Sequence, residues 1–435
     1  MFKHILNNHK YKFLAAAVGV TATETYNSGN KELLSILPKN DIEQKLTKLQ
    51  HSYSFLGKVK RVDINQLPSN SPIEDCHIES IINNDAPNSN YNDKIMLFGV
   101  MDGHSGGHTS NFLQQNLVAK VISKLYPYFN SSDKVEDLDY FNETLKKSFI
   151  ELDNQIVLEG FNKLLKSPTR ETLFNSTMPA ISGSCCLLTI FNTNNDILTV
   201  AQTGDSRAIL VSKESEYEYS VRQLSKDLTG DNPEEIARIK NLHPNEDSAV
   251  FRGRVLGSLQ PSRAFGDYRY KIDLSKHQNL LPPDVKMFLR RPPKNLLTPP
   301  YVTAEPDVHN FKIDLKKDKY MIIASDGLFE LLNNEDIARL VAQWENANIK
   351  NPDELKINVV NEPIKQDTFK YDQRYKQGLP CIKKDENLAT HLIRNALSFG
   401  GQEEFVDLMC SLKEPGSRKY RDDLTVQVIF FNDTK

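Results

Sequence analysis

The 435-residue sequence has only five cysteines, and no two of them stand in C-x-x-C spacing. An odd, scattered set argues against a disulfide framework and a structural zinc site, and it favours a reducing compartment. No stretch reaches the roughly 18 apolar residues of a confident membrane-spanning helix. Neither sign of charge is in clear excess, with 54 Lys and Arg against 57 Asp and Glu. A net charge of -3 gives no general attraction for nucleic acid or an anionic membrane, so we expect no nucleic-acid partner.

What remains is the composition of an ordinary globular protein. Hydrophobic residues make up 39% of the chain and charged residues 26%, which supplies a core and excludes global disorder. We expect one large domain over residues 50–435, because no segment has the character of a linker between domains. Three polar or proline-rich segments are predicted to be surface insertions, at residues 83–93, 281–300 and 345–386.

The N-terminal segment is basic and free of acidic residues up to Glu24. Its lysines, followed by the apolar run Phe13–Ala22, are typical of a mitochondrial presequence, although the segment lacks Arg. The apolar run also resembles the core of a secretory signal peptide. Because the cysteine usage favours a reducing compartment, we predict that residues 1–30 are a targeting segment and that the protein is mitochondrial.

Hydrophobic patterning predicts several buried strands. Ile95–Met101 and Tyr320–Ser325 are continuous apolar runs, and each runs straight into an Asp-Gly pair. Ser184–Phe191 and Ile197–Gln202 flank a polar turn and predict a hairpin, which Ala208–Val211 extends into an antiparallel meander. Alternation of apolar and polar residues over 424–430 predicts a final strand.

Helices are predicted between these strands. Apolar residues at helical spacing indicate two long helices, over 112–125 and 141–156. Asn232 followed by Pro233 predicts the cap and first residue of another helix, and a further one begins near Asn334. Strands separated and followed by helices indicate the α+β class.

Acidic residues stand where the predicted strands begin or end. They are Glu74, Asp75, Asp102, Asp205, Asp326, Asp422 and Asp423. Any one of them alone is most simply a turn residue, because Asp and Gly are common in turns. Together they are the hard oxygen ligands that Mg²⁺ or Mn²⁺ prefers, and without a cation they would repel one another. The pattern predicts a hydrolytic centre with two metal ions.

Eight motifs occur in order along the chain: IED, FGVMDGHSGG, SGS, TGDSRAIL, SRAFGD, EPDV, IIASDGLFELL and YRDDLTV. As a set they resemble the metal-dependent PPM family of Ser/Thr protein phosphatases, also called type 2C. NQLPSNSPIED, GRVLGSLQPSRAFGDYRYK and TAEPDV are most similar to its mitochondrial pyruvate dehydrogenase phosphatase branch. The resemblance implies an αββα sandwich of two antiparallel sheets flanked by helices, with the metal site at one edge between the sheets.

The resemblance also implies roles for single residues. The two ions, Mg²⁺ or Mn²⁺, would be held by Glu74, by Asp102 as the bridging ligand, by the Gly103 carbonyl, and by Asp326 and Asp422. Asp205 would share a weaker third ion with Asp326. Asp75 would position the attacking water, and His104 would be the general acid for the departing Ser or Thr oxygen. Two cations about 3.5 to 4 Å apart would activate that water for in-line attack on phosphorus, without a phosphoenzyme.

One position departs from the family pattern. Asn70 stands where most members carry an Arg that binds substrate phosphate, and the mitochondrial branch resembles this chain in that respect. An amide cannot supply the bidentate, charged contacts of a guanidinium. We therefore expect weak binding of small phosphate esters, and a lower KM after Asn70→Arg.

Other residues allow two interpretations. Arg207 and Arg263 are by type suited to clamp phosphate, but structural ion pairs are the favoured interpretation. Cys185 and Cys186 are adjacent, yet no C-x₅-R sequence follows them, so we place them in the interior of a strand rather than in a nucleophilic site.

The expected partner is a phosphoprotein, and a subunit of the pyruvate dehydrogenase complex is the first candidate. Another phosphoprotein substrate and a catalytically silent scaffold are the alternatives. Intact acids at the predicted metal site argue against the scaffold, because an inactive relative is free to lose them. A phosphodiesterase would need a basic groove for nucleic acid, which the charge balance does not provide.

Overall fold

The computed structural model describes residues 36–83, 94–129, 137–275, 277–348, 354–360, 382 and 385–432. The predicted targeting segment lies outside these residues. So do nearly all of the first predicted insertion and most of the third.

A seven-stranded sheet forms one layer of the molecule. Its order is β1 (His51–Ser54), β2 (Val59–Leu67), β17 (Leu424–Phe431), β15 (Asp318–Ala324), β9 (Arg207–Lys213), β10 (Glu218–Gln223) and β16 (Lys356–Val359). All neighbours pair antiparallel except β10 and β16, which are parallel. The predicted final strand is therefore an interior strand of this sheet.

A five-stranded antiparallel sheet forms the second layer. Its order is β14 (Asp307–Lys312), β8 (Ile197–Thr203), β7 (Cys186–Asn192), β4 (Lys94–Met101) and β3 (Cys76–Asn83). Two smaller sheets consist of β13 (Phe265–Gly266), β6 (Gly183–Ser184) and β5 (Gly103–His104), and of β11 (Val250–Phe251) and β12 (Arg254–Val255). Side chains from both large sheets, such as Phe98, Leu187, Leu210 and Ile429, share one apolar cluster. The two sheets thus pack face to face.

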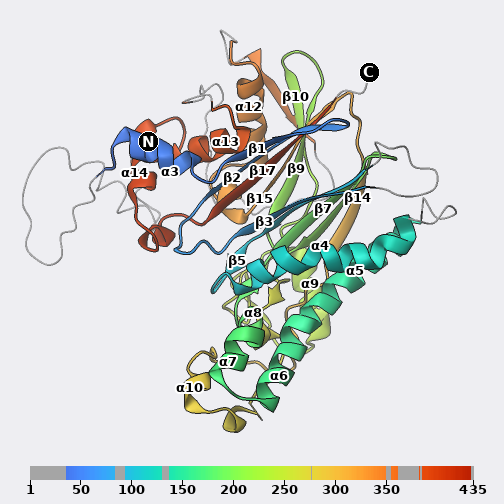
Figure 1. The fold of residues 1–435 in the computed structure, drawn as a ribbon, viewed down its shortest axis with the longest axis vertical. Coiled ribbons are helices and arrows are strands. Elements are labelled where there is room, and N and C mark those ends of the chain that lie inside the picture. The colour runs from blue at the N-terminus through green and yellow to red at the C-terminus, as the bar shows by residue number, and fades with distance from the viewer. Residues whose placement is uncertain are drawn as a thin grey trace, which may run out of the picture.

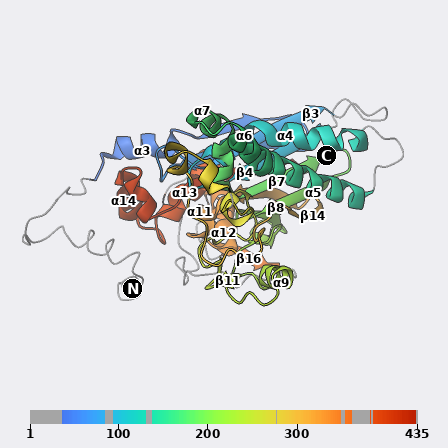
Figure 2. The ribbon, with the colours of Figure 1, turned by 90° about the horizontal axis from the view of Figure 1, so that it is seen from below.

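Helices cover the outer faces of both sheets (Figures 1 and 2). On the seven-stranded sheet lie α3 (Lys39–Thr47), α11 (Asp326–Phe329), α12 (Asn334–Glu345), α13 (Leu388–Leu397) and α14 (Glu403–Ser411). On the five-stranded sheet lie α4 (His108–Phe129), α5 (Leu138–Asn154), α6 (Gly160–Lys166), α8 (Met178–Ile181) and α10 (Pro283–Lys286). This arrangement confirms the predicted αββα sandwich.

Local capping explains two of the predicted helix starts. Asn232 accepts a hydrogen bond from the Glu234 amide at 2.9 Å and caps α9 (Pro233–Leu242), which has Pro at its first position. Asn333 and Asp336 form a reciprocal capping box at the start of α12. Both helices begin where the sequence predicts.

The predicted meander is wrong at its third strand. β7 and β8 form the expected hairpin, but β9 does not pair with β8 and lies in the other sheet. The chain crosses between the layers at Gly204, whose φ of +105° is accessible chiefly to glycine. Because β9 is buried on both faces, its apolar run alone cannot indicate which sheet it joins.

The register of the strands brings the predicted acids to one edge of the sandwich. Cys76 pairs with Met101, so Asp75 and Asp102 extend from neighbouring strand ends. Ala324 pairs with Arg207 in the other sheet, which places Asp326 near Asp205. No helix in the described ranges combines the length and apolar character needed to cross a membrane.

Candidate metal centre

Three aspartates converge at this edge. Asp102 follows β4, Asp205 lies between β8 and β9, and Asp326 opens α11 directly after β15. One carboxylate oxygen from each lies within 4.8 Å of the other two. The two sheets therefore contribute jointly to a single acidic cluster, as the sequence predicts.

The electrostatics of this cluster fit a divalent cation. Burial raises the pKa of Asp102 and Asp326 well above the ordinary value, and the neighbouring carboxylates raise it further. Burial likewise raises the pKa of Asp205 to about 6. The Oδ1 atom of Asp326 is buried and has no hydrogen-bond partner among the described residues. Carboxylates that repel one another, with one buried oxygen unpaired, are suited to a hard cation such as Mg²⁺ or Mn²⁺.

Glu74 and Gly103 lie against each other beside the cluster. A side chain at position 103 would place its Cβ 2.1 Å from the carbonyl oxygen of Glu74, so only glycine permits this approach. Oε1 of Glu74 accepts a hydrogen bond from the Gly106 amide at 2.7 Å. Glu74 is held in place, but it is not a member of the group of three.

Asp75 is buried at the same edge. Its Oδ2 accepts a hydrogen bond from the Thr425 hydroxyl at 2.7 Å. Burial, followed by the charge of Asp423, raises the pKa of Asp75 to about 7. A buried carboxyl group that is fixed in this way is suited to orient a water molecule.

Asp422 lies near the three aspartates, but its carboxylate binds Arg418. Its carboxylate forms an ion pair with Arg418 and accepts the Asp423 amide at 2.7 Å. Its Cβ lies 3.2 Å from where a side chain on Gly327 would begin, next to Asp326. The structure therefore places Asp422 beside the group of three and does not include it.

His104 has a partner that the sequence analysis missed. Its Nε2 atom lies 2.6 Å from Oδ2 of Asp267, the last residue of the FGD motif. Burial alone would lower the pKa of His104, but the charge and hydrogen bond of Asp267 outweigh it and the pKa is raised. The position of Asp267 in SRAFGD is the only signal the sequence offers for this role.

Asp423, one of the acids that the sequence places at strand ends, has a role that the sequence analysis did not assign to it. Its Oδ1 accepts hydrogen bonds from the Ser69 amide at 2.5 Å and the Ser69 hydroxyl at 2.9 Å, and its Oδ2 accepts the Glu74 amide at 2.9 Å. It thereby fixes the loop that carries Glu74 and Asp75. The second acid of YRDD organises the backbone of the site.

The two arginines left open by the sequence are structural. Arg207 pairs with Asp227, and its guanidinium lies 4.5 Å from the Phe329 ring centre. Arg263 binds Glu235 with two nitrogens, at 2.7 and 3.1 Å. These pairs confirm the favoured interpretation.

The adjacent cysteines are buried. Cys186 lies in β7, whereas Cys185 precedes the strand and its thiol donates to Oδ1 of Asp205 at 3.1 Å. Burial raises the pKa of both thiols, which opposes formation of a nucleophilic thiolate.

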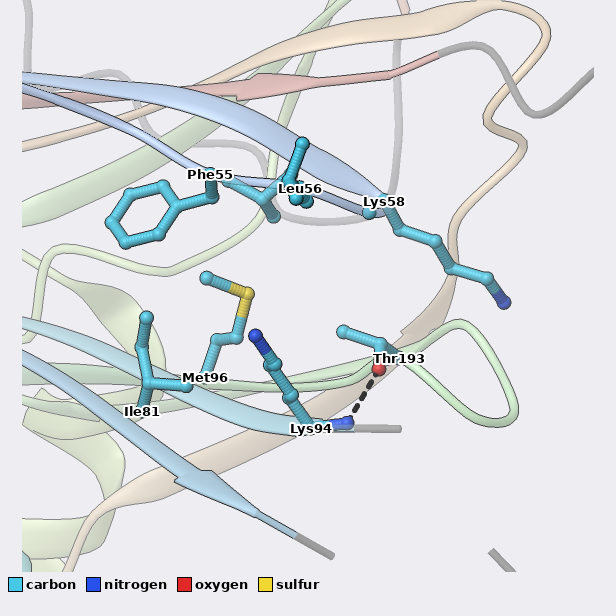
Figure 3. A pocket seen from close by; sticks show the side chains of 9 residues that line it. Phe55, Leu56, Lys58, Ile81, Lys94, Met96 and Thr193 are labelled. Atoms are coloured by element: carbon cyan, nitrogen blue, oxygen red, sulfur yellow. Dashed lines mark hydrogen bonds between the residues drawn. The ribbon is translucent and has the colours of Figure 1, made fainter. Parts of the chain in front are cut away.

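A hollow lies at the other end of β4 from Asp102 (Figure 3). It has a volume of about 90 Å³ and is lined by the β1–β2 turn, with Phe55 and Leu56, and by Ile81, Lys94 and Met96. No carboxylate lines it, and Lys94 and Asp102 flank opposite ends of β4. It is therefore separate from the candidate metal centre.

Comparison with known proteins identifies the family. The sequence pattern of the family described as Protein phosphatase 2C matches residues 68–370, which is more than half of the chain. The chain belongs to the protein phosphatase 2C family. Members of this family are metal-dependent, so this chain is a metal-dependent protein serine/threonine phosphatase, as predicted.

Three relatives illustrate the similarity. Pyruvate dehydrogenase (acetyl-transferring) phosphatase 1, mitochondrial, of Saccharomyces cerevisiae is 42% identical over 96% of this chain and 77% of its own. A protein phosphatase 2C homolog of Schizosaccharomyces pombe is 33% identical over 98% and 96%. The bovine pyruvate dehydrogenase phosphatase 1, also named mitochondrial, is 30% identical over 92% and 82%. The first and third of these relatives confirm the predicted branch of the protein phosphatase 2C family and the mitochondrial location.

Proposed function

We propose that this protein phosphatase 2C removes phosphate from serine or threonine residues of pyruvate dehydrogenase. The observation that carries the proposal is the convergence of Asp102, Asp205 and Asp326 at the sheet edge. The substrate is supported by the relatives in budding yeast and cattle, which are named for that activity.

We propose that two Mg²⁺ or Mn²⁺ ions are the cofactors. Glu74, Asp102, the Gly103 carbonyl, Asp326 and Asp422 would hold them, and Asp205 with Asp326 would hold a weaker third. The bound ions would supply a hydroxide-like nucleophile and neutralise charge on the phosphoryl oxygens. Asp422 must exchange its Arg418 partner for metal in this scheme.

The chain's own residues supply orientation and the proton. Asp75, fixed by Thr425, would orient the attacking water. His104, whose Nε2 is held by Asp267, would give its proton to the departing serine or threonine oxygen. Glu74 and its loop are fixed by Asp423 and Gly106, so these contacts pre-organise the site.

Dephosphorylation of purified phosphorylated pyruvate dehydrogenase tests the proposal. We expect release of phosphate with Mg²⁺ or Mn²⁺, none with EDTA, and faster release than from an unrelated phosphoprotein such as casein. Casein turnover equal to or faster than that of pyruvate dehydrogenase would contradict the substrate assignment.

The same assay separates the alternatives. A catalytically silent scaffold would hydrolyse neither substrate in the presence of metal. For a different phosphoprotein substrate, phosphoproteins in mitochondria isolated with and without this protein would differ at sites other than pyruvate dehydrogenase. That comparison names the substrate directly.

A further inference from the structure

The proposed phosphate site lacks a positive group at position 70. The side-chain amide of Asn70 donates to Oε2 of Glu74 at 3.3 Å, so it supports a candidate metal ligand. A phosphate monoester carries about 1.5 to 2 negative charges at neutral pH. A guanidinium from another part of the chain would match that charge best, because it binds phosphate oxygens in pairs.

The segment before β17 is attached to the loop that carries Asn70. The hydroxyl of Ser417, in the short 3-10 helix Gly416–Lys419, donates to the carbonyl of Ser69 at 2.7 Å. Arg421 donates to the carbonyls of Leu67 at 3.1 Å and Pro68 at 2.5 Å. Arg418, between these anchors, is therefore held next to the Asn70 loop although it is far away in sequence.

The guanidinium of Arg418 faces the metal centre and remains accessible. It forms an ion pair with Asp422, and 39% of its side chain is exposed to solvent. Asp422 in turn lies beside Asp326, since its Cβ is 3.2 Å from where a side chain on Gly327 would begin. The guanidinium of Arg418 is therefore held at the border of the acidic cluster.

Most other arginines around the site are engaged elsewhere. Arg207 and Arg263 are bound to Asp227 and Glu235, and Arg421 is buried against backbone carbonyls. Arg290 is exposed and donates to the Ser105 hydroxyl at 2.6 Å, next to His104. Arg290 is therefore the other arginine near the site against which Arg418 should be tested.

We propose that Arg418 binds the phosphate of the substrate, in the role that most family members give to an Arg at position 70. The assignment rests on the proposed phosphatase function. Arg418 and a divalent cation compete for the Asp422 carboxylate, so metal binding there leaves the guanidinium free for phosphate. With Arg418 in this role, small phosphate esters should bind more tightly than Asn70 alone would predict.

The full chain carrying Arg418→Gln tests the assignment through two affinities. Calorimetry with inorganic phosphate and Mg²⁺-loaded protein should show a Kd about tenfold higher than wild type, and KM for p-nitrophenyl phosphate should rise equally. Affinity for Mn²⁺ should stay the same or increase, because a competing cation has been removed. A purely structural role would weaken both affinities, and an unchanged phosphate Kd would overturn the assignment.

A second substitution in the same chain provides a rescue. Asn70→Arg added to Arg418→Gln should restore phosphate affinity to within about threefold of wild type, because it returns a guanidinium to the same loop. Failure of this rescue, in a double variant that melts like wild type, would count against a shared phosphate site. If the Arg418→Gln variant is unstable, the same measurements are made on Arg418→Lys, which keeps the positive charge.

Matched controls define the other outcomes. Lys419→Gln changes an exposed charge on the same turn and should leave the phosphate Kd unchanged. A larger effect of Arg290→Gln than of Arg418→Gln would place the phosphate contact beside Ser105 and overturn the proposal. Absence of hydrolysis by wild type would contradict the proposed function, whereas calorimetric phosphate binding would still test Arg418.

Discussion

The imidazole of His104 and the carboxylate of Asp267 lie 2.6 Å apart, although 163 positions separate them in sequence. Gly183 leaves room for both, because a Cβ there would lie 2.1 Å from Nε2 of His104 and 2.3 Å from Oδ2 of Asp267. Asp267 itself adopts a left-handed backbone with φ of +50°. Three motifs, DGH, SGS and FGD, thus meet at one hydrogen bond.

The first prediction concerns this pair. Asp267→Asn should lower kcat for a phosphothreonine peptide by about 100-fold, because a smaller fraction of the imidazole is protonated near neutral pH and the ring is no longer held in place. The same variant should hydrolyse p-nitrophenyl phosphate almost normally, since nitrophenolate leaves without a proton. Parallel kinetics with the two substrates check the prediction. Equal losses on both would mean that Asp267 supports the site in another way.

The second prediction concerns Gly183. Gly183→Ala should displace the His104–Asp267 pair and reduce peptide turnover as strongly as Asp267→Asn, with KM nearly unchanged. Gly416→Ala is the matched control, because nothing lies within 4 Å of its added Cβ. Full activity of Gly183→Ala would show that the pair tolerates displacement.

The third prediction concerns the acidic cluster. Asp326→Asn should abolish metal-dependent hydrolysis, with less than a tenth of wild-type turnover in Mn²⁺. In EDTA the same variant should melt at a higher temperature than wild type, because one buried, repelling carboxylate is gone. A turnover assay with Mn²⁺ measures the first effect, and differential scanning calorimetry in EDTA measures the second. A lower melting temperature in EDTA would indicate that Asp326 stabilises the fold without metal.

The fourth prediction concerns stability at low pH. Burial alone would raise the pKa of Glu235, but Arg263 and Arg238 outweigh it and lower the pKa from 4.5 to about 2. The stabilisation is therefore complete above pH 4.5 and declines as the pH falls toward 2. Glu235→Gln should lower the free energy of unfolding at pH 7 by about 3 kcal/mol.

Urea unfolding at several pH values measures this difference. The gap between wild type and Glu235→Gln should shrink below pH 4.5. Asp284→Asn removes the exposed pair with Arg170 and should change stability by less than about 0.5 kcal/mol at any pH. A gap that stays constant down to pH 2 would contradict the depressed pKa.

The fifth prediction concerns targeting. Deletion of residues 1–30 should leave a soluble, active phosphatase in the cytosol, because every residue proposed for the metal centre lies at position 74 or beyond. Fractionation and activity assays of cells expressing both forms check it. Mitochondrial import of the shortened chain would place the signal elsewhere.

The sequence predicts the parts of the site that are local in the chain. Asp102 and Asp326 are identifiable because each follows a buried strand and precedes a glycine, and those strands exist as predicted. The partners that position the site are harder to predict. Asp267 and Asp423 act through contacts that only the folded chain creates, so their local sequence does not indicate which groups they bind.

The placement of β9 fails for a related reason. Its neighbours on both sides are strands of similar apolar character, so hydrophobic burial would be satisfied in either sheet. Only the turn at Gly204, with its positive φ, directs it to the seven-stranded sheet. The sequence therefore predicts the strand but not the sheet that it joins. Asp205 lies at the edge between the two sheets because β8 and β9 belong to different sheets.

The position of β17 in the interior of the seven-stranded sheet determines when the site can form during translation. Gln66 bonds Thr425, 359 positions later, so the strands on which Glu74 and Asp75 depend are translated long before their partners. A ribosome that has not yet reached β17 holds a chain without Asp422, Asp423 or Arg418. The nascent protein therefore lacks residues of the proposed metal and phosphate sites, and we expect hydrolysis only after the C-terminal strand has left the ribosome.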